Sequence, residues 1–210
     1  MLSLNALLNI LGVLVVIAIA ALVFYISVRD RNTDASAPAA KRRKTDAGVE
    51  ATLRAVSRYA ASHGFKMIRP AHFGVGERKT DLDAVVVTFG GLIGIRCFGY
   101  NGEIFANPGE SEWLWVTGES REKIPDPVAL CAADARALRD VLMQDAKLRS
   151  VPVECLPVFT DKAVQISAPR SLSLFRRNQL ISTLEQQKYL EDRGLDVDRV
   201  CALLGAARRD

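Results

Sequence analysis

The pattern of hydrophobic and polar positions divides the chain into a long apolar segment, a short polar segment and a remainder with globular periodicity. Residues 4–28 carry no charge, and their apolar run is interrupted mainly by Asn5 and Asn9. A helix rises ~1.5 Å per residue, so about 20 apolar residues cross the hydrocarbon core of a bilayer. We therefore predict a membrane-spanning helix over residues 4–28, which makes residues 1–28 a transmembrane anchor.

A cleaved signal peptide is the alternative interpretation of this segment. It requires a positively charged start, a shorter apolar run and small residues at the cleavage site. In this chain no residue before Arg29 is charged, and the apolar run ends in bulky residues, Phe24-Tyr25-Ile26. The pattern favours a retained anchor.

The polar segment that follows, residues 29–45, contains Ala, Ser and Pro, has no periodicity and reads as a linker. Its excess of Lys and Arg predicts that the C-terminal domain is cytoplasmic and the N-terminus lies outside. The basic run at residues 41–44 would also fit a nucleic-acid patch or a nuclear signal. Beside a membrane span, a topology determinant that attracts anionic lipid is the favoured interpretation.

The positive charge of the chain belongs to this linker. Residues 29–44 hold six Lys or Arg and two Asp, and the 22 remaining basic residues equal the 22 remaining acidic ones. Strong nonspecific binding to DNA depends on neutralising phosphates, so a domain of zero net charge argues against it. The cysteines at 97, 131, 155 and 201 are scattered, which predicts reduced, buried thiols, and two histidines give little basis for a zinc site.

From residue 46 onward, helical and strand-like periodicities alternate. We predict a helix over 46–62, a strand over 65–68, a loop over 70–80, and strands over 82–89, 92–98, 103–105 and 113–116. Asp126 and Pro127 predict the start of a helix with Leu130, Ala133, Ala137, Leu138 and Val141 buried. Strands over 151–159 and 163–166 and helices over 173–188 and 196–207 complete the order. This order predicts an α/β domain with a mixed sheet flanked by helices.

The strand over 113–116 carries Trp113 and Trp115 on one face. Aromatic side chains of this kind can stack on nucleic-acid bases. Packing of the strand against the domain is the favoured use.

Several stretches together resemble one family of domains. They are Gly48-Val49-Glu50, "TDLDAVVV" at 80–87, "GGLIGIRCFGYNGEI" at 90–104, "PDPVALCAADARAL" at 125–138 and "VPVECLPVFTD" at 151–161. In order and spacing they resemble the NERD family, the nuclease-related domain, a branch of the PD-(D/E)XK nuclease fold. The resemblance covers residues 46–170 and implies a restriction-endonuclease-like architecture, with residues 171–210 as a helical part packed on it.

The resemblance implies metal-assisted cleavage of phosphodiester bonds. In such enzymes carboxylates on the first helix and the following strands hold Mg²⁺, and a lysine beside the last carboxylate helps to position water. A hard divalent cation requires several oxygen ligands, polarises the phosphate and generates hydroxide.

Only part of this machinery carries over to the present chain. Glu50 matches the glutamate of the first helix, Asp83 matches the strand aspartate, and Asp81 stands where the family has an acidic neighbour. The next strand should read Glu-x-Lys, but Arg96 and Phe98 occupy those positions. The family pattern Pro-x-x-Gln at the central helix reads Pro-x-x-Leu here, ending at Leu130.

The change from glutamate to Arg96 reverses the charge at the centre of the expected site. A guanidinium is permanently charged and offers only donors, so it would take over the electrostatic role of the cation. We predict that Asp83, an acid among apolar neighbours, is its partner. Two alternatives remain open: Arg96 points to solvent after a register shift of one residue, and Glu50 is merely a favourable first-turn acid.

The sequence thus suggests a membrane-anchored cytoplasmic domain that lacks catalysis and binds nucleic acid or a protein, with the bilayer contacted through residues 4–28 and no cofactor. The alternative is an active nuclease in which Mg²⁺ is bound by Glu50 and Asp83 with Asp81 or Glu103 as replacement ligands.

Overall fold

A computed structural model describes the backbone of residues 38–107 and 109–209, and the side chains from Ala47 onward. The chain divides into two compact units, residues 1–43 and 44–210, and the sheets and the site lie in the second. In the part of the chain that is described, no helix has both the length and the apolar character to cross a membrane. The span predicted over residues 4–28 lies outside the described residues.

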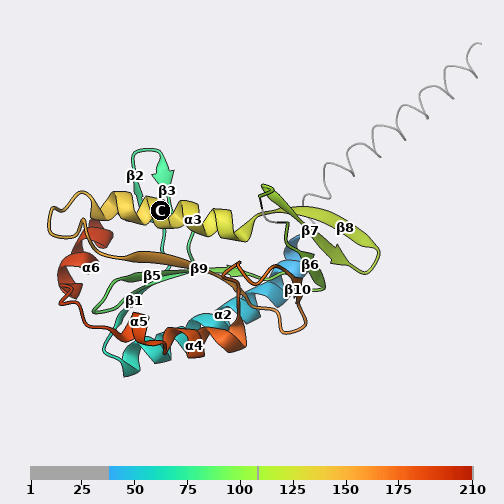
Figure 1. Ribbon diagram of the computed structural model, residues 1–210, viewed down its shortest axis with the longest axis horizontal. Helices are drawn as coiled ribbons and strands as arrows, with labels where there is room; N and C mark the ends of the chain where they lie inside the picture. The colour runs from blue at the N-terminus through green and yellow to red at the C-terminus, as the bar shows by residue number, and fades with distance from the viewer. Residues whose placement is uncertain (1–37, 108, 210) are drawn as a thin grey trace, which may run out of the picture. The chain divides into compact units, whose positions relative to one another are not determined.

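A five-stranded mixed sheet forms the centre of the domain, as predicted (Figure 1). Its order is β1 (Lys66–Ile68), β4 (Ala84–Val87), β5 (Leu92–Phe98), β9 (Val153–Phe159) and β11 (Phe175–Arg176). The β1–β4 and β4–β5 pairs are antiparallel, whereas β5, β9 and β11 run parallel. Strands β4 and β5 are largely buried because their Val, Ile and Leu side chains are covered on both faces.

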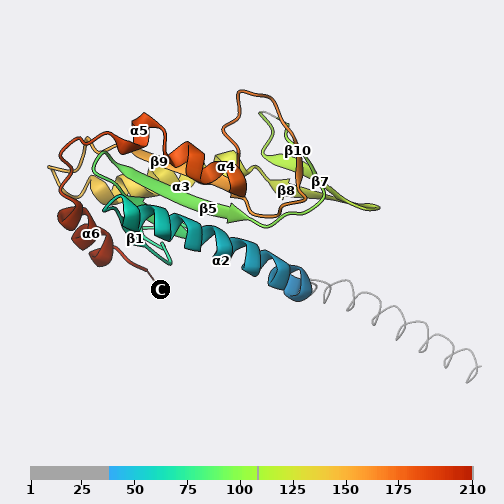
Figure 2. The same ribbon diagram turned by 90° about the horizontal axis from the view of Figure 1, so that it is seen from below.

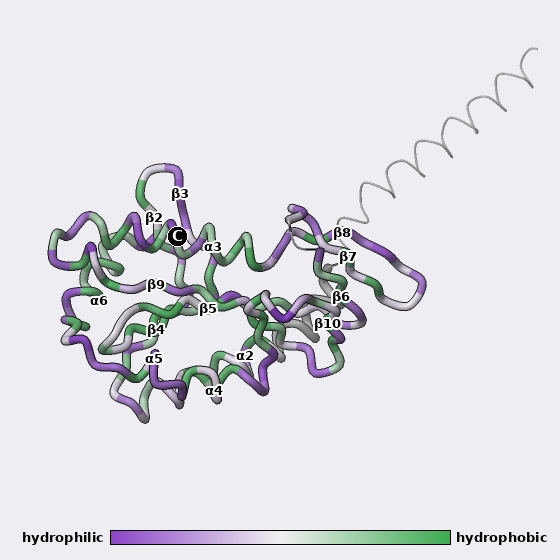
Figure 3. Tube along the Cα trace, in the orientation of Figure 1, coloured by the Kyte–Doolittle hydropathy of each residue, from purple (hydrophilic) through white to green (hydrophobic). Residues whose placement is uncertain are grey.

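Two smaller sheets are attached to this centre. One has the order β10 (Gln165–Ser167), β6 (Glu103–Phe105), β7 (Glu112–Thr117) and β8 (Ser120–Pro125). The other is a short hairpin of β2 (Gly74–Val75) and β3 (Arg78–Lys79). Figure 3 shows β5 mostly hydrophobic and the exposed hairpin strand β3 hydrophilic.

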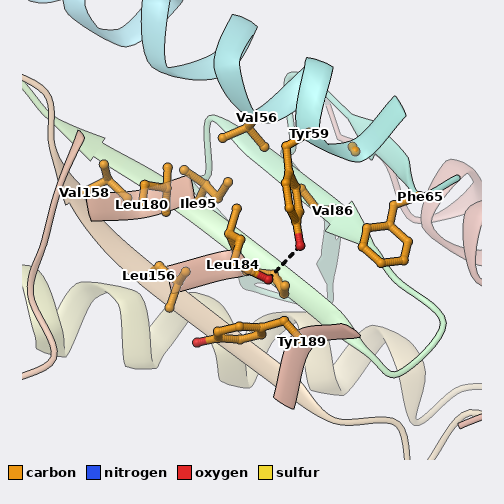
Figure 4. Packing of buried hydrophobic residues seen from close by; sticks show 12 residues of the cluster. Val56, Tyr59, Phe65, Val86, Ile95, Leu156, Val158, Leu180, Leu184 and Tyr189 are labelled. Carbon is orange, nitrogen blue, oxygen red and sulfur yellow. Dashed lines mark hydrogen bonds between the residues drawn. The ribbon is translucent and has the colours of Figure 1, made fainter. Parts of the chain in front are cut away.

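One face of the central sheet is covered by α2 (Pro38–Ser62), α4 (Arg177–Leu184) and the short α5 (Gln187–Leu190), as seen from below in Figure 2. Val56 and Tyr59 of α2 pack with Leu180 and Leu184 of α4 over the sheet residue Ile95 (Figure 4). The buried Tyr59 hydroxyl donates a hydrogen bond of 2.6 Å to the Leu184 carbonyl oxygen. This bond joins the first and the later helices across the apolar layer.

The opposite face is covered by α3 (Pro127–Leu142) and α6 (Val197–Ala206). The Asp126 carboxylate accepts a hydrogen bond of 2.7 Å from the Val128 N–H, so the predicted N-cap of α3 is confirmed. Leu138 and Val141 of α3 are completely buried against the sheet. The chain between the parallel neighbours β5 and β9 forms β6, β7 and β8 and then α3, which serves as the crossover helix.

A third apolar cluster lies between the small sheet and the ends of β5 and β9. Trp113 and Trp115 are both buried in it, with exposed fractions of 1% and 8%. The prediction that these tryptophans pack against the domain is therefore confirmed.

Some predicted elements differ from the structure. Helix α2 begins at Pro38, so the last part of the predicted linker is helical. The predicted loop over 70–80 contains the β2–β3 hairpin, and β8 was not predicted because only Ile124 of its six residues is buried. The helix predicted over 173–188 is instead strand β11 followed by α4 and α5, since Phe175 and Arg176 pair with β9.

Candidate functional site

The site forms where β4 and β5 part. The hydrogen-bonded ladder between them ends at the pair of Ala84 and Ile95, whereas β5 continues to Phe98. On this edge the Asp83 carboxylate accepts a hydrogen bond of 2.7 Å from the Cys97 N–H, and the Asp83 N–H donates to the Ile95 carbonyl at 3.0 Å. Asp83 therefore satisfies a backbone donor that the β4 ladder does not reach.

The Arg96 side chain points from β5 toward α3 and is held by two carboxylates. Its Nη1 donates to Asp134 Oδ2 and its Nη2 donates to Asp81 Oδ2, each at 2.8 Å. Asp134 is almost fully buried, with 4% of its side chain exposed, whereas 17% of Arg96 and 68% of Asp81 are exposed. The other oxygen of Asp134 accepts the Asp81 N–H at 2.9 Å.

This arrangement corrects the predicted partner of Arg96. The carboxylates at ion-pair distance belong to Asp134 and Asp81, while that of Asp83 is turned to the Cys97 N–H. The side chain of Arg96 is directed into the site, so the register shift that would place it in solvent does not occur.

Burial and charge act in opposite directions on Arg96. Burial lowers the pKa of the guanidinium, but the hydrogen bond and charge of Asp134 and the charge of Asp81 raise that pKa above its ordinary value. The side chain is therefore a permanent cation.

Burial has the opposite sign for the acid next to it. It raises the pKa of the Asp83 carboxyl above its ordinary value, against the lowering effect of the Cys97 N–H. The charge of Asp81 raises this pKa further, and the charge of Arg96 lowers it.

On the other side of the site, Glu50 projects from α2. Its carboxylate accepts a hydrogen bond of 3.1 Å from Nη1 of Arg69, which follows β1, and about half of each side chain is exposed. The His72 Nδ1 atom lies 4.0 Å from the Asp81 carboxylate. Glu50 thus has an arginine partner of its own.

Phe98, at the position where the family has a lysine, is buried, with 7% of the residue exposed. Its ring packs with Phe159 and Tyr100, at centroid distances of 5.7 and 6.2 Å. The guanidinium carbon of Arg96 lies 5.9 Å from the ring centre, within reach of a cation–π contact. No amine is available at this position to position water.

The predicted site residues line a single cavity of about 690 Å³. They are Glu50, Asp81, Asp83, Arg96 and Phe98, and they are joined there by Arg69, His72 and Cys97. Glu103, considered as a replacement ligand, lies instead on β6 and borders a separate cavity. Leu130 packs against the third apolar cluster, which contains Trp113 and Trp115.

The carboxylates that line this cavity already have hydrogen-bond partners. Within the described residues, no group of three or more His, Cys, Asp or Glu side chains is arranged to hold a metal ion. Glu50 is bound by Arg69, Asp83 by a backbone N–H, and the third position is a guanidinium. One oxygen of Glu50 and one of Asp83 therefore already accept a hydrogen bond.

Sequence reasoning missed two residues of the site, Asp134 and Arg69. Asp134 lies on the buried stripe of α3 with Cys131, Leu138 and Val141, so its helical spacing was a readable signal. Arg69 pairs with Glu50 only because β1 folds back against β4, and no local pattern shows that contact.

The comparison with known proteins gives one match. A family model described as "Nuclease-related domain" (NERD) matches residues 44–160. This range contains all the cavity residues described above and more than half of the chain. The chain matches none of the curated proteins and none of the solved structures with which it was compared.

Proposed function

Because the chain belongs to the NERD family, the nuclease-related domains, we propose that it retains the nuclease architecture as a binding module and does not hydrolyse phosphodiester bonds. The observation that carries this proposal is the Arg96 guanidinium, held at 2.8 Å by both Asp134 and Asp81. It stands where the family's catalytic pattern has a metal-binding glutamate. A positive side chain there opposes the binding of a second positive charge.

The pairing of Arg96 supports the proposal. An unpaired guanidinium would repel a divalent cation ~6 Å away by about 5 kcal/mol at an effective dielectric constant of ~20, before its ion pairs are counted. Asp134 and Asp81 direct their oxygens at Arg96, so they neutralise it and are occupied by it. Recruiting them to a metal would leave Arg96 partly buried without a partner.

The excess of carboxylates over arginines in the site supports a second candidate function. The four carboxylates of Glu50, Asp81, Asp83 and Asp134 outnumber the two arginines of this site by two. Such an excess attracts cations, and Asp81 is largely exposed. An active nuclease with rearranged ligands is therefore the competing hypothesis.

A cleavage assay separates the two hypotheses. The full-length chain, purified in a neutral detergent, is incubated with plasmid and single-stranded DNA in the presence of Mg²⁺ or Mn²⁺. We expect the wild type and Asp83→Asn to show the same background. Cleavage by the wild type that Asp83→Asn abolishes would establish the competing hypothesis, because a contaminating nuclease would not respond to this substitution.

We also propose that residues 4–28 anchor this domain in a membrane with its C-terminal part in the cytoplasm. The proposal is supported by the uncharged run and the basic residues that follow it. In sealed right-side-out vesicles, a tag at the C-terminus should resist added protease until detergent is present. Digestion of the tag in intact vesicles would contradict the proposed orientation. Extraction of the chain by alkaline carbonate would contradict the proposed membrane anchor.

The net charge of the domain bears on which class of ligand the module binds. With no net charge over residues 45–210, a protein partner is favoured over extended nucleic acid. Binding of the detergent-purified chain to labelled DNA at two salt concentrations tests this preference. Tight binding that weakens steeply with salt would contradict it.

A further inference from the structure

A second cavity of about 500 Å³ lies at the carboxyl ends of β5 and β9. These strands are parallel neighbours that end together at the pair of Phe98 and Phe159. Gly99 and Asn101 follow β5, and Thr160 and Lys162 follow β9. Crevices beyond the carboxyl ends of parallel strands are the usual ligand sites of open α/β sheets.

Helices from the same face of the sheet close this cavity. Ala47 and Gly48 of α2 border it, and so does Arg177, the first residue of α4. Helix α2 approaches the end of β9 closely, because a Cβ atom on Gly48 would lie 3.2 Å from the Thr160 carbonyl oxygen. Helix α2 and the end of β9 are thus packed together at the border of this cavity.

The charges in this cavity lack the compensation seen in the Arg96 site. Neither Lys162 nor Arg177 forms an ion pair with any described residue, although Arg177 is only partly exposed. The one acid in the lining, Asp161, accepts a hydrogen bond of 2.7 Å from the Ala163 N–H. Two cations therefore face a common space with donors still to be used.

The start of α4 adds to this positive potential. Its N-cap is Arg176, its first residue is Arg177, and its first turn contains no acid. The N-terminal end of a helix is electropositive, so cations there are unfavourable unless an anion is near. An anionic ligand in the cavity would remove this repulsion.

We infer that the cavity binds a phosphate group carried on an organic molecule. A guanidinium fork matches phosphate oxygens in a bidentate manner, and a lysine adds a point charge. The Asn101 amide supplies a further donor at the same rim. The volume exceeds what a phosphate ion alone needs, which leaves room for the group that carries it. No residue is shared with the lining of the Arg96 cavity, so this inference goes beyond the proposed function and does not depend on it.

The phosphate could be carried by a soluble ester or by a phospholipid headgroup, and the experiment has an arm for each. Full-length protein in neutral detergent is titrated calorimetrically with glycerol 3-phosphate and with inorganic phosphate. The same protein in nanodiscs of phosphatidylcholine, with or without phosphatidic acid, is titrated with glycerol 3-phosphate. Competition that appears only with phosphatidic acid identifies the headgroup as the occupant.

The test variant is Lys162→Gln/Arg177→Gln, which removes both cations of the cavity. The matched control is Arg136→Gln/Arg170→Gln, which removes two exposed cations that border neither cavity. We expect the test variant to lose affinity for the phosphate by about tenfold or more, because two charge-assisted contacts are lost. The control should retain wild-type affinity, and both variants should keep the wild-type melting temperature.

Two results would overturn the inference. One is the absence of binding by the wild type to both phosphates in detergent, combined with phosphatidic acid having no effect. The other is equal affinity in the wild type, the test variant and the control, which would place any bound anion elsewhere. Neither result depends on whether the chain cleaves DNA.

Discussion

Removing either partner of the Arg96–Asp134 ion pair should lower the stability of the domain, whereas removing both should restore most of it. Nη1 of Arg96 lies 2.8 Å from Asp134 Oδ2, and only 4% of the Asp134 side chain is exposed. Arg96→Met leaves a buried carboxylate whose remaining described hydrogen bond comes from the Asp81 N–H. Asp134→Leu leaves the guanidinium with the largely exposed Asp81 alone.

The magnitude follows from the burial of the pair. Breaking a buried ion pair by removing one partner costs about 3–5 kcal/mol, which for a domain of this size lowers the melting temperature by roughly 6–20 °C. Replacing both partners with apolar groups of similar volume is often neutral or stabilising. The double variant Arg96→Met/Asp134→Leu should therefore melt above either single variant.

Tryptophan fluorescence during thermal unfolding measures this cycle selectively. The only two tryptophans of the chain, Trp113 and Trp115, are buried in the domain. The control is Arg78→Met, which breaks the exposed pair of Arg78 and Asp140, also on α3, at 2.9 Å. Exposed pairs contribute about 0–1 kcal/mol, so this variant should melt within a few degrees of the wild type.

Two outcomes would refute the reasoning. If Arg96→Met has the same melting temperature as the wild type, the guanidinium contributes nothing to the stability of the fold and is free to move away from a ligand. If the double variant loses as much stability as the two single variants combined, the residues act independently and the ion pair is not the source of their effect.

Three further predictions follow from the same contacts. Asp83→Asn keeps an acceptor for the Cys97 N–H and removes the titration of the carboxyl. Burial raises the pKa of Asp83 in the folded state, so the wild type has the stability that protonated Asp83 contributes at acidic pH and loses it as the pH rises through that pKa. The melting temperature of Asp83→Asn minus that of the wild type should therefore increase from acidic to neutral pH, and a constant difference would contradict this prediction. Tyr59→Phe deletes the 2.6 Å hydrogen bond to Leu184 and should cost about 1–3 kcal/mol in urea unfolding, because a buried carbonyl loses its partner; an unchanged midpoint would show that water replaces the hydroxyl. Burial raises the pKa of the Cys131 thiol to about 12, so at neutral pH it should react with a maleimide only under denaturing conditions, as peptide mapping would show, and labelling at native rates equal to those in urea would contradict the burial.

The parts of the fold that the sequence predicted are those with strong local signals. The apolar run of β5 and the Asp126 N-cap of α3 can each be recognised from a few neighbouring residues. The parts that it did not predict depend on distant contacts. Strand β8 is exposed at five of its six positions and exists because it pairs with β7.

The same division holds for the site. Arg96 was recognised because it breaks an expected pattern within one strand. Its partner was assigned to Asp83 because an acid among apolar neighbours needs a partner, but the Asp83 carboxylate is taken by the Cys97 N–H at the edge of β5. The acid that pairs with Arg96 comes from α3, 38 residues later in the chain, and only the packing of that helix brings it there.

Binding of Mn²⁺ tests the central claim, that the Arg96 guanidinium takes the place of a divalent metal, most directly. Mn²⁺ is titrated into the full-length chain, into Asp83→Asn and into Arg96→Glu/Phe98→Lys, and the free ion is followed by electron paramagnetic resonance. The account predicts that the wild type removes no more Mn²⁺ from solution than Asp83→Asn does, while Arg96→Glu/Phe98→Lys gains a site. A wild-type chain that binds Mn²⁺ stoichiometrically and loses it on Asp83→Asn would contradict the account.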